Sequence, residues 1–373
     1  SLPNVLELTE VQTENFTFDR PFSYFVHVHH NQPLWAKNLD VIPTKILDEV
    51  RKGNCKLIFD NTLEGKSING DKFLNPFYES IDKLKLPTKN IYFITNNLVA
   101  EKTHQEYHRA DKINVISVMW NVFDIQRLID QEDLPKEVSV DMEYKYKSVN
   151  IFKTKHFLKI NRTNRNERDI FLLFLNFEKL LDKCLVSFPE LHKWPEYPEM
   201  FYKYIQKENI SDLKLKLPFD IDDTDKTNHG PAGVGEGFFD ADLAFNPIHY
   251  RNSFISIVMG AFAFDKDGYH LHSSTFNPMY CGHPIIQFAP YKTLEVMKQY
   301  GFKTFDKWWD ESYDNEKDDW KRLQMIMDLV LEISEYDKRD LLNIYKSMEE
   351  TLQHNISVIE NYDIKTNLYD RIF

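Results

Sequence analysis

The segment from Tyr250 to Tyr313 constrains the fold more than any other part of the chain. It contains an apolar run over 254–264, a polar turn into a short helix over 272–279, a Gly-Pro turn into a second apolar run over 282–287, and a helix over 291–300. This order is typical of a parallel α/β sheet, in which a crossover must join each pair of parallel strands. The polar turn follows a strand and begins a helix, where such sheets hold anionic ligands.

The first 120 residues alternate in the same way. Apolar and aromatic runs predict strands at four places: 22–29, 55–59, 90–95 and 114–119. Helical spacing or composition predicts helices between them: 44–51, 73–84 and 100–108. Strands and helices at this spacing indicate a Rossmann-like domain.

The region 125–150 is charged and lacks strong periodicity, so we place a domain junction there. A strand over 155–160 and a helix over 167–181 then begin a second domain, and the chain beyond Trp320 is helical over 323–333 and 338–359. We therefore predict an N-terminal Rossmann-like domain (1–148), a C-terminal Rossmann-like domain (149–335) and a helical tail (336–373).

Several motifs resemble a known family. Thr275–Pro278, Gly282–Pro284 and Gly301–Asp306, with Trp309–Tyr313 downstream, are similar to sequences of phage and large-virus glycosyltransferases. Weaker matches lie at 157–168 and 55–64. That family is GT-B-like and distantly similar to fucosyltransferases. The resemblance implies an α/β protein of two Rossmann-like domains facing each other across a cleft, the first on the acceptor side and the second binding the donor, with a last helix that commonly returns to the first domain.

The chain departs from the family at its donor site. The family usually has Glu-Lys-Thr where this chain has Ser273, Ser274 and Thr275, and often a second Glu where Gly260 stands. In the family the Glu grips the donor ribose and the Lys its phosphate. Serine hydroxyls and helix amides bind phosphate without the charge-assisted hydrogen bonds that are about twice as strong.

The predicted donor-binding residues are cationic or hydroxyl-bearing side chains at two strand-to-helix turns. They are Arg162, Arg165, Arg168, Ser273, Ser274, Thr275 and Asn277. Guanidinium groups and a helix N-terminus match the oxygens of a diphosphate. The alternatives are a solvated basic turn for the arginines and helix capping for the hydroxyls. His270 and His272 flank the second turn and are weaker candidates to replace the missing charge.

The predicted catalytic base lies in the first domain. His29 or His30, after the first strand, is placed to take a proton from an acceptor hydroxyl, and Glu64 is the carboxylate alternative, with Asp60 the third choice. Alternate histidines His27 and His29 are a weak metal signal. The acidic pairs near 220–223 and 240–242 are more typical of solvated loops, so we predict no metal and no cofactor beyond a nucleotide-sugar co-substrate.

Composition excludes several protein classes. The chain has 373 residues, of which 42% are hydrophobic and 14% aromatic, so it can fill two cores and disorder is not expected. A net charge of −12 argues against sequence-independent binding to duplex DNA. Three cysteines form no disulfide framework, and no apolar run is long enough to cross a membrane. We expect a cytoplasmic protein, in the host cytoplasm if the chain is viral.

The sequence therefore predicts a glycosyltransferase that moves a sugar from a nucleotide-sugar donor to a hydroxyl acceptor. The acceptor is a modified base in viral DNA, a glycan or a protein. The alternative is a catalytically silent GT-B-like protein that serves as a binding or structural component of a virus. A fainter alternative is a nucleotide-binding α/β enzyme of unrelated chemistry.

Overall fold

The computed structural model describes most of the chain, in two compact units. The described residues are 20–28, 39–62, 65, 67–122, 125–126, 154–160, 165–188, 190–191, 197–217, 219, 247–260, 263–264, 266 and 268–373. Unit 1 comprises the described residues of Ser1–Phe123, Phe264–Leu271 and Tyr362–Phe373, and unit 2 those of Asp124–Ala263 and His272–Asn361. Each unit is a mixed α/β body built on a four-stranded parallel sheet, consistent with a Rossmann-like fold.

Unit 1 contains a sheet whose strands follow one another in sequence order, β1-β2-β3-β4. Its described elements are β1 (Phe22–His27), α2 (Thr44–Lys52), β2 (Cys55–Asn61), α3 (Asn75–Lys83), β3 (Ile91–Thr95), α4 (Ala100–Glu106), β4 (Asn114–Ser117) and α16 (Ile364–Ile372). Gly53 ends α2 with φ +84, a left-handed conformation that glycine adopts without steric cost.

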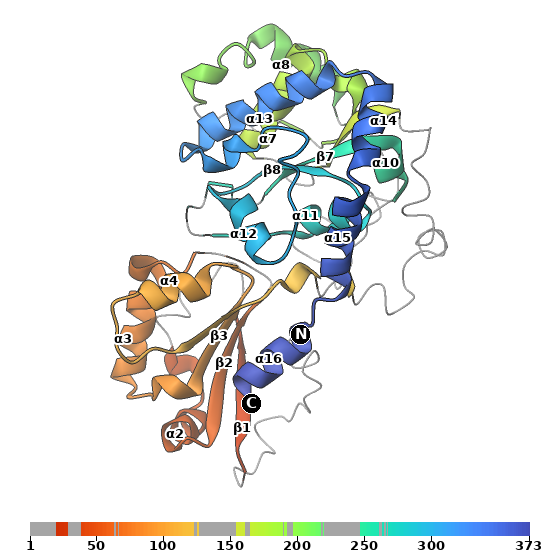
Figure 1. Cartoon of the computed structure of the whole chain (residues 1–373). Helices are drawn as coiled ribbons and strands as arrows, with labels where there is room; N and C mark the ends of the chain where they lie inside the picture. The colour runs from red at the N-terminus through yellow and green to blue at the C-terminus, as the bar shows by residue number, and fades with distance from the viewer. Residues whose placement is uncertain are drawn as a thin grey trace. The chain divides into compact units, whose positions relative to one another are not determined.

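The two faces of this sheet are covered by different parts of the chain. Strand residues such as Phe59 and Phe93 pack with Ile46 and Phe77 of α2 and α3. Their neighbours in sequence point to the other face, because side chains alternate along a strand. There a second cluster joins the strands to α16; it comprises Ile58, Tyr92, Ile94, Ile116, Val118, Trp120, Ile364, Leu368 and Ile372. Figure 1 shows α2, α3 and α4 on one side of the sheet and α16 on the other.

Unit 2 contains a sheet of order β6-β5-β7-β8. Its described strands are β5 (Lys155–Ile160), β6 (Cys184–Ser187), β7 (Ser253–Met259) and β8 (Ile285–Phe288). Its helices are α7 (Asn166–Phe177), α8 (Lys207–Lys216), α10 (Pro247–Asn252), α11 (Ser273–Tyr280), α12 (Thr293–Gln299), α13 (Asp319–Ser334), α14 (Lys338–Ser347) and α15 (Glu349–Glu360). Helix α7 leads from β5 to β6, and α11 leads in the opposite direction from β7 to β8. Right-handed crossovers in opposite directions place these two helices on opposite faces, as Figure 1 shows.

Some boundaries differ from the sequence-based expectation. The predicted junction at 148/149 lies outside the described residues. The strand predicted over 254–264 ends at Met259, and Phe264–Leu271 belong to unit 1. The tail divides, because α14 and α15 belong to unit 2 whereas α16 belongs to unit 1. Apolar periodicity identifies a buried face but does not say which unit buries it.

Candidate functional site

The carboxyl edge of the unit 2 sheet contains a topological switch point between β5 and β7. These two strands are neighbours, and the chain leaves them in opposite directions, into α7 and α11. In open α/β sheets, ligands commonly bind at the point where the connections diverge in this way. The helices that follow β5 and β7 carry the predicted donor residues.

Two cationic side chains are buried at this edge. Arg168, on the first turn of α7, is 9% exposed, and its Nη2 donates to the carbonyl oxygen of Met259 at 2.8 Å, at the end of β7. This hydrogen bond joins α7 to β7 across the switch point. Burial, and then the charge of Arg165, lower the pKa of Arg168 to about 10. Lys159, the penultimate residue of β5, is 1% exposed, and burial followed by the Arg168 charge lowers its pKa well below the ordinary 10.5.

The acidic residues beside these cations are also buried. Glu167 is 4% exposed, and burial raises its pKa. Asp169 is fully buried, and the hydroxyl of Tyr197 lies 3.4 Å from its Oδ2. A buried group of mixed charges is costly unless it is well paired, so such groups are concentrated at functional sites. The sequence identified the arginines here but not Lys159, whose only signal is a lysine within an apolar strand.

The other predicted arginines have different outcomes. Arg165 is the N-cap residue of α7 and is half-buried; its carbonyl oxygen accepts from the backbone N–H groups of Arg168 and Asp169. Arg162 lies outside the described residues. Of the predicted cationic turn, the structure describes Arg165 and Arg168. The Arg168 guanidinium donates to a backbone carbonyl oxygen.

The serine-rich turn forms the N-terminus of α11. His272 is the N-cap residue, and its Nδ1 lies 2.9 Å from Ser273 Oγ and accepts weakly from Ser274 N–H at 3.5 Å. Ser273 is buried, whereas Ser274 is exposed. His272 therefore has a capping role, which the sequence had given to the serines, and Ser274 is the hydroxyl that a ligand can reach.

Thr275 and Asn277 lie on the inner side of α11. Thr275 is fully buried, and its hydroxyl donates to Gln287 Oε1 on β8 at 3.2 Å. Asn277 is 6% exposed, and its carbonyl oxygen accepts from Cys281 N–H. Thr275 holds α11 against the sheet. Because both side chains are buried, direct contact with a ligand would require α11 to move.

One of the motifs that carry the family resemblance, Gly282–Pro284, has a structural role. His283, of Gly282–Pro284, is 1% exposed; its Nε2 lies 2.8 Å from the carbonyl oxygen of Ser253 and its Nδ1 2.8 Å from Ser256 Oγ. The imidazole ring thus ties the turn before β8 to β7. An imidazole with both ring nitrogens engaged is fixed in its rotamer and position.

The acidic run after Trp309 anchors α12. The Asp314 carboxylate accepts from Leu294 N–H at 3.1 Å and from Glu295 N–H at 3.3 Å, at the start of α12. Glu311 is buried and accepts from Phe305 N–H at 2.8 Å. Burial raises the pKa of Glu311 to about 7. These carboxylates satisfy backbone donors that would otherwise be orphaned.

Unit 1 has a polar edge of its own at the carboxyl ends of its strands. Seven polar residues there are at least nine-tenths buried; they are Asp60, Asn61, Thr62, Thr95, Asn96, Asn97 and Ser117. The sequence drew attention to Asp60 and Asn61 but missed the Thr-Asn-Asn run after β3. Polar residues that directly follow a buried strand are the signal that could have identified them.

Within this edge, His27 and Asp60 form a pair. His27 Nδ1 lies 3.2 Å from Asp60 Oδ2, and the His27 side chain is half exposed. The other carboxylate oxygen accepts from the Thr62 hydroxyl at 2.7 Å and from Thr62 N–H at 3.1 Å. Burial by itself raises the pKa of Asp60, but hydrogen bonds from His27 and Thr62 outweigh burial, so the pKa is lowered. Asp60 is therefore suited to orient an imidazole rather than to act as a base.

The segment after β7 completes this edge. Leu98 N–H donates to the Tyr269 carbonyl oxygen at 2.9 Å, and Asn121 Nδ2 donates to the Leu271 carbonyl oxygen at 2.8 Å. A Cβ atom at Gly65 would lie 2.5 Å from His270 Cβ, so only glycine fits there. His270 thus belongs to unit 1 and His272 to unit 2, although they are two residues apart.

The remaining predictions concern three residues outside the described part, a metal site and a membrane-spanning helix. His29, His30 and Glu64 lie outside the described residues. Among the residues that are described, no group of three or more His, Cys, Asp or Glu side chains could hold a metal ion. None of the described helices has the length and apolar character needed to span a membrane.

Comparison with known proteins adds no assignment. The sequence matches no family model and no curated protein.

Proposed function

We propose that the protein is a glycosyltransferase that transfers a sugar from a nucleotide-sugar donor to a hydroxyl acceptor. The observation that carries this proposal is the switch point of unit 2, where two diverging helix starts and the buried Lys159 and Arg168 meet one sheet edge. Helix N-termini and cations are the groups that bind phosphate oxygens. The proposal assigns the donor diphosphate to this edge, with Arg165 and the exposed Ser274 in contact with it and the buried Lys159 beneath the surface.

The chemistry assigned to the donor site is stabilisation of the leaving group. As the bond between the sugar and the phosphate oxygen breaks, negative charge grows on the diphosphate, and fixed cations and amides lower the energy of that transition state. In this proposal the GT-B-like arrangement gives unit 2 the donor and unit 1 the acceptor.

The acceptor side requires a base, and His27 is the best candidate among the described residues. Asp60 lies against its Nδ1, and in this proposal Nε2 accepts the hydroxyl proton. The carboxylate would also stabilise the imidazolium that forms. His29, His30 and Glu64 remain predictions for the same role, and the acceptor remains a hydroxyl of a modified DNA base, a glycan or a protein.

A second candidate function is supported by the α11 turn. The hydroxyls of Ser273 and Thr275 are buried and engaged within the protein, and the Glu-Lys pair of the resembled family is missing. A chain that kept the fold and lost the side chains that bind the donor would be a catalytically silent binding or structural component.

The test is ligand binding by a panel of uridine, guanosine, cytidine and adenosine diphosphosugars. A ligand at 100 times its Kd stabilises the folded state by about 2.7 kcal/mol, which thermal unfolding detects. We expect one nucleotide class to stabilise the protein and to release nucleoside diphosphate when an acceptor is added. Stabilisation without release favours the silent alternative, and the absence of both contradicts the proposed donor site.

A gain-of-binding variant sharpens this test. Ser274→Lys adds an ammonium group at the exposed start of α11. If the diphosphate binds there, the added charge should tighten nucleoside diphosphate binding about tenfold. Ser357→Lys on α15 is the matched control, because it adds the same charge elsewhere in unit 2. Equal changes in both variants would contradict the assignment.

A further inference from the structure

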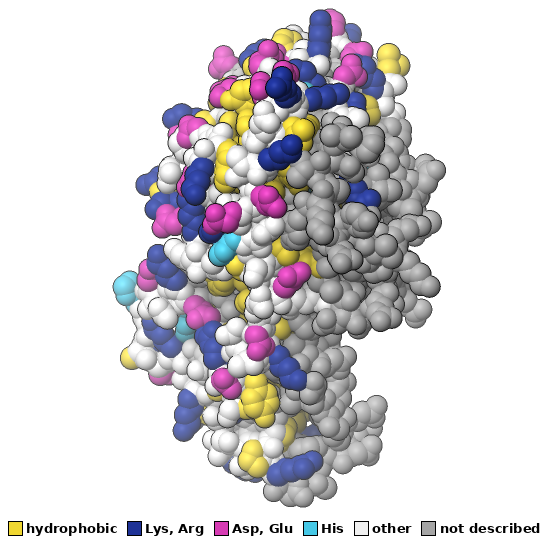
Figure 2. Space-filling model, turned by 45° about the vertical axis from the view of Figure 1, so that its right-hand side comes forward, with side chains coloured by type: hydrophobic (Ala, Val, Ile, Leu, Met, Phe, Trp, Pro, Cys, Tyr) yellow, Lys and Arg dark blue, Asp and Glu magenta, His cyan; other side chains and the backbone are white. Residues whose placement is uncertain are grey.

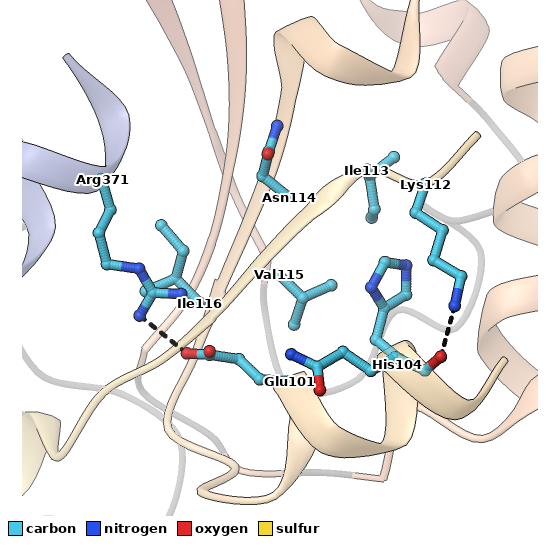
Figure 3. Close-up of a pocket in the computed structure, with 9 residues that line it drawn as sticks. Glu101, His104, Lys112, Ile113, Asn114, Val115, Ile116 and Arg371 are labelled. Carbon is cyan, nitrogen blue, oxygen red and sulfur yellow. Dashed lines mark hydrogen bonds and ion pairs between the residues drawn. The ribbon is translucent and has the colours of Figure 1, made fainter. Parts of the chain in front are cut away.

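A pocket of about 290 Å³ lies beside β4, the last strand in the described order of the unit 1 sheet. It is bounded by α4, by β4 with the residues before it, and by the end of α16 (Figure 3). We call it the edge pocket and define it by Glu101, His104, Lys112, Ile113, Val115 and Arg371. All of these residues belong to unit 1, and none of them belongs to the donor or base site proposed above.

The backbone of β4 supplies one donor to the pocket. Val118 N–H donates to the Thr95 carbonyl oxygen, so alternate residues of β4 face β3 and the residues between them face the opposite edge. Two of the outward N–H groups are engaged, since Ile113 donates to the Tyr78 hydroxyl at 3.0 Å and Ser117 donates to Glu101 Oε1 at 2.8 Å. Val115 lies between them, and its N–H is directed to the edge pocket.

The proton on His104 is fixed by a chain of hydrogen bonds. The Tyr78 oxygen accepts from Ile113 N–H, and the same oxygen lies 2.7 Å from His104 Nε2. Burial raises the pKa of Tyr78 to about 12, so the phenol keeps its proton. Because its oxygen already accepts from Ile113 N–H, we take the phenol as the donor to Nε2. Burial lowers the pKa of His104 to about 4, so the ring is neutral and carries its own proton on Nδ1. His104 lines the pocket, and its Nδ1 is therefore an N–H donor and not an acceptor.

The charges of the pocket leave one cation in excess. Glu101 accepts from Arg371 Nη1 at 2.9 Å and from Ser117 N–H, so its charge is compensated at one end of the pocket. Lys112 lies at the other end (Figure 3), where its Nζ donates to the neutral carbonyl oxygen of Gln105 at 2.5 Å. This contact positions the ammonium without neutralising it, and an ammonium has three donors.

We propose that the edge pocket binds a small oxyanion, a carboxylate or phosphate group held by the Lys112 ammonium and by the N–H groups of His104 and Val115. Fixed N–H donors beside one cation select an acceptor-rich anion and disfavour a cation or a donor-rich ligand. Pockets for drug-sized ligands measure roughly 300–1,000 Å³, so about 290 Å³ suits a small molecule, and none of the residues of this pocket belongs to the proposed donor site. The site is therefore distinct from that of the donor.

The test is a titration of the whole chain, labelled with ¹⁵N-histidine, with inorganic phosphate and with succinate at constant ionic strength maintained by chloride. We expect the ring nitrogen signals of His104 to shift in a saturable manner with at least one of the two anions and not with chloride. The phosphate and succinate arms show which anion the pocket prefers. A shift that is absent with both, or that is equal with chloride, overturns the proposal.

Matched variants locate the effect. Lys112→Gln should weaken binding about tenfold, and Lys112→Arg should restore it to within about threefold, because the charge is kept. Lys102→Gln removes an exposed cation from α4, the helix that bounds the pocket, and should leave binding unchanged. If Lys102→Gln weakens binding as much as Lys112→Gln, the anion is responding to overall charge and the proposal is wrong. Should Lys112→Gln fail to fold, Lys112→Met removes the same charge and should weaken binding to the same extent, and unchanged binding in that variant overturns the proposal.

Discussion

The two units of the molecule use the same elements in different orders. In unit 1 every crossover advances in the same direction, so α2, α3 and α4 lie on one face and the other face needs a cover from elsewhere. In unit 2 the chain leaves the central strands β5 and β7 in opposite directions, so crossover helices lie on both faces. The direction of the crossovers thus decides both how each core is closed and where a ligand crevice can form.

This difference has a consequence for the charged residues of each unit. The switch point of unit 2 contains the buried cations Lys159 and Arg168. Unit 1 has no switch point among its described strands, and its carboxyl edge contains neutral amides and hydroxyls with the single pair His27–Asp60. We therefore assign the anionic donor to unit 2 and the hydroxyl acceptor to unit 1 in the proposed function.

The largest expected effect tests the packing of α16 on one face of the unit 1 sheet. Leu368→Ala removes a fully buried side chain from α16 and should destabilise unit 1 by about 2–5 kcal/mol, through lost burial and a new cavity. Hydrogen exchange should show lost protection in β2, β3 and β4 and unchanged protection in β5 and β7. Tyr369→Ala, at a position that is half exposed, is the control and should cost less than about 0.5 kcal/mol. Equal loss of protection in both sheets would refute the idea that α16 serves unit 1 alone.

The next effect tests the acidic anchor of unit 2. The ordinary pKa of 4.5 for Glu311 is raised to about 7 by burial, so the unfolded chain loses this proton first. Its contribution is present below pH 4.5 and is lost as the pH rises through 7, by about 3 kcal/mol at ~1.4 kcal/mol per pH unit. Glu311→Gln keeps an oxygen for Phe305 N–H and cannot ionise. In urea unfolding the variant should gain stability over the natural chain between pH 4 and pH 8, and a constant difference would contradict this.

The third effect is of similar size and opposite sign, and it belongs to unit 1. Burial lowers the pKa of His104 from 6.5 to about 4, so the unfolded chain takes up this proton first. Stability should fall as the pH drops from 6.5 to about 4, by about 3 kcal/mol. His104→Gln should flatten this fall, measured by hydrogen exchange of β4 peptides, whereas the exposed control His108→Gln should not. An unchanged acid limb in His104→Gln would show that other groups cause it.

The smallest effect on stability links the buried cation of unit 2 to function. Lys159→Met replaces a fully buried amino group with an apolar side chain, and we expect the folded state to gain about 1–2 kcal/mol at pH 7. The same change should abolish stabilisation by the nucleotide-sugar, if Lys159 helps to hold the diphosphate. A variant that is less stable and still binds the donor would assign Lys159 a purely structural role.

Much of the fold followed from local patterns. The strands over 55–61, 91–95 and 155–160, and the helix that Gly53 ends, lie where apolar periodicity and turn residues predict them. The single helix predicted over 338–359 is divided at Met348, because α14 packs against β7 whereas α15 packs against α11. Periodicity is a local property and does not report such a change of partner.

The candidate sites were less predictable. Arg168 was identified from its place after a strand, but its hydrogen bond to Met259 joins residues 91 positions apart. Threonine is a residue type that commonly binds phosphate, yet the Thr275 hydroxyl donates to Gln287. The pair His27–Asp60 and the edge pocket depend on the register of parallel strands and on α16, which no local motif encodes.

The sequence by itself determined the α/β class and the positions of most elements, because period-two and helical apolar patterns are written in neighbouring residues. Only the tertiary structure decided the strand orders, the unit to which 264–271 and α16 belong, and the burial of Lys159, His104 and Glu311. Strand order and burial are set by contacts between residues distant in sequence, and the pKa of a side chain follows from its burial and its partners rather than from its residue type.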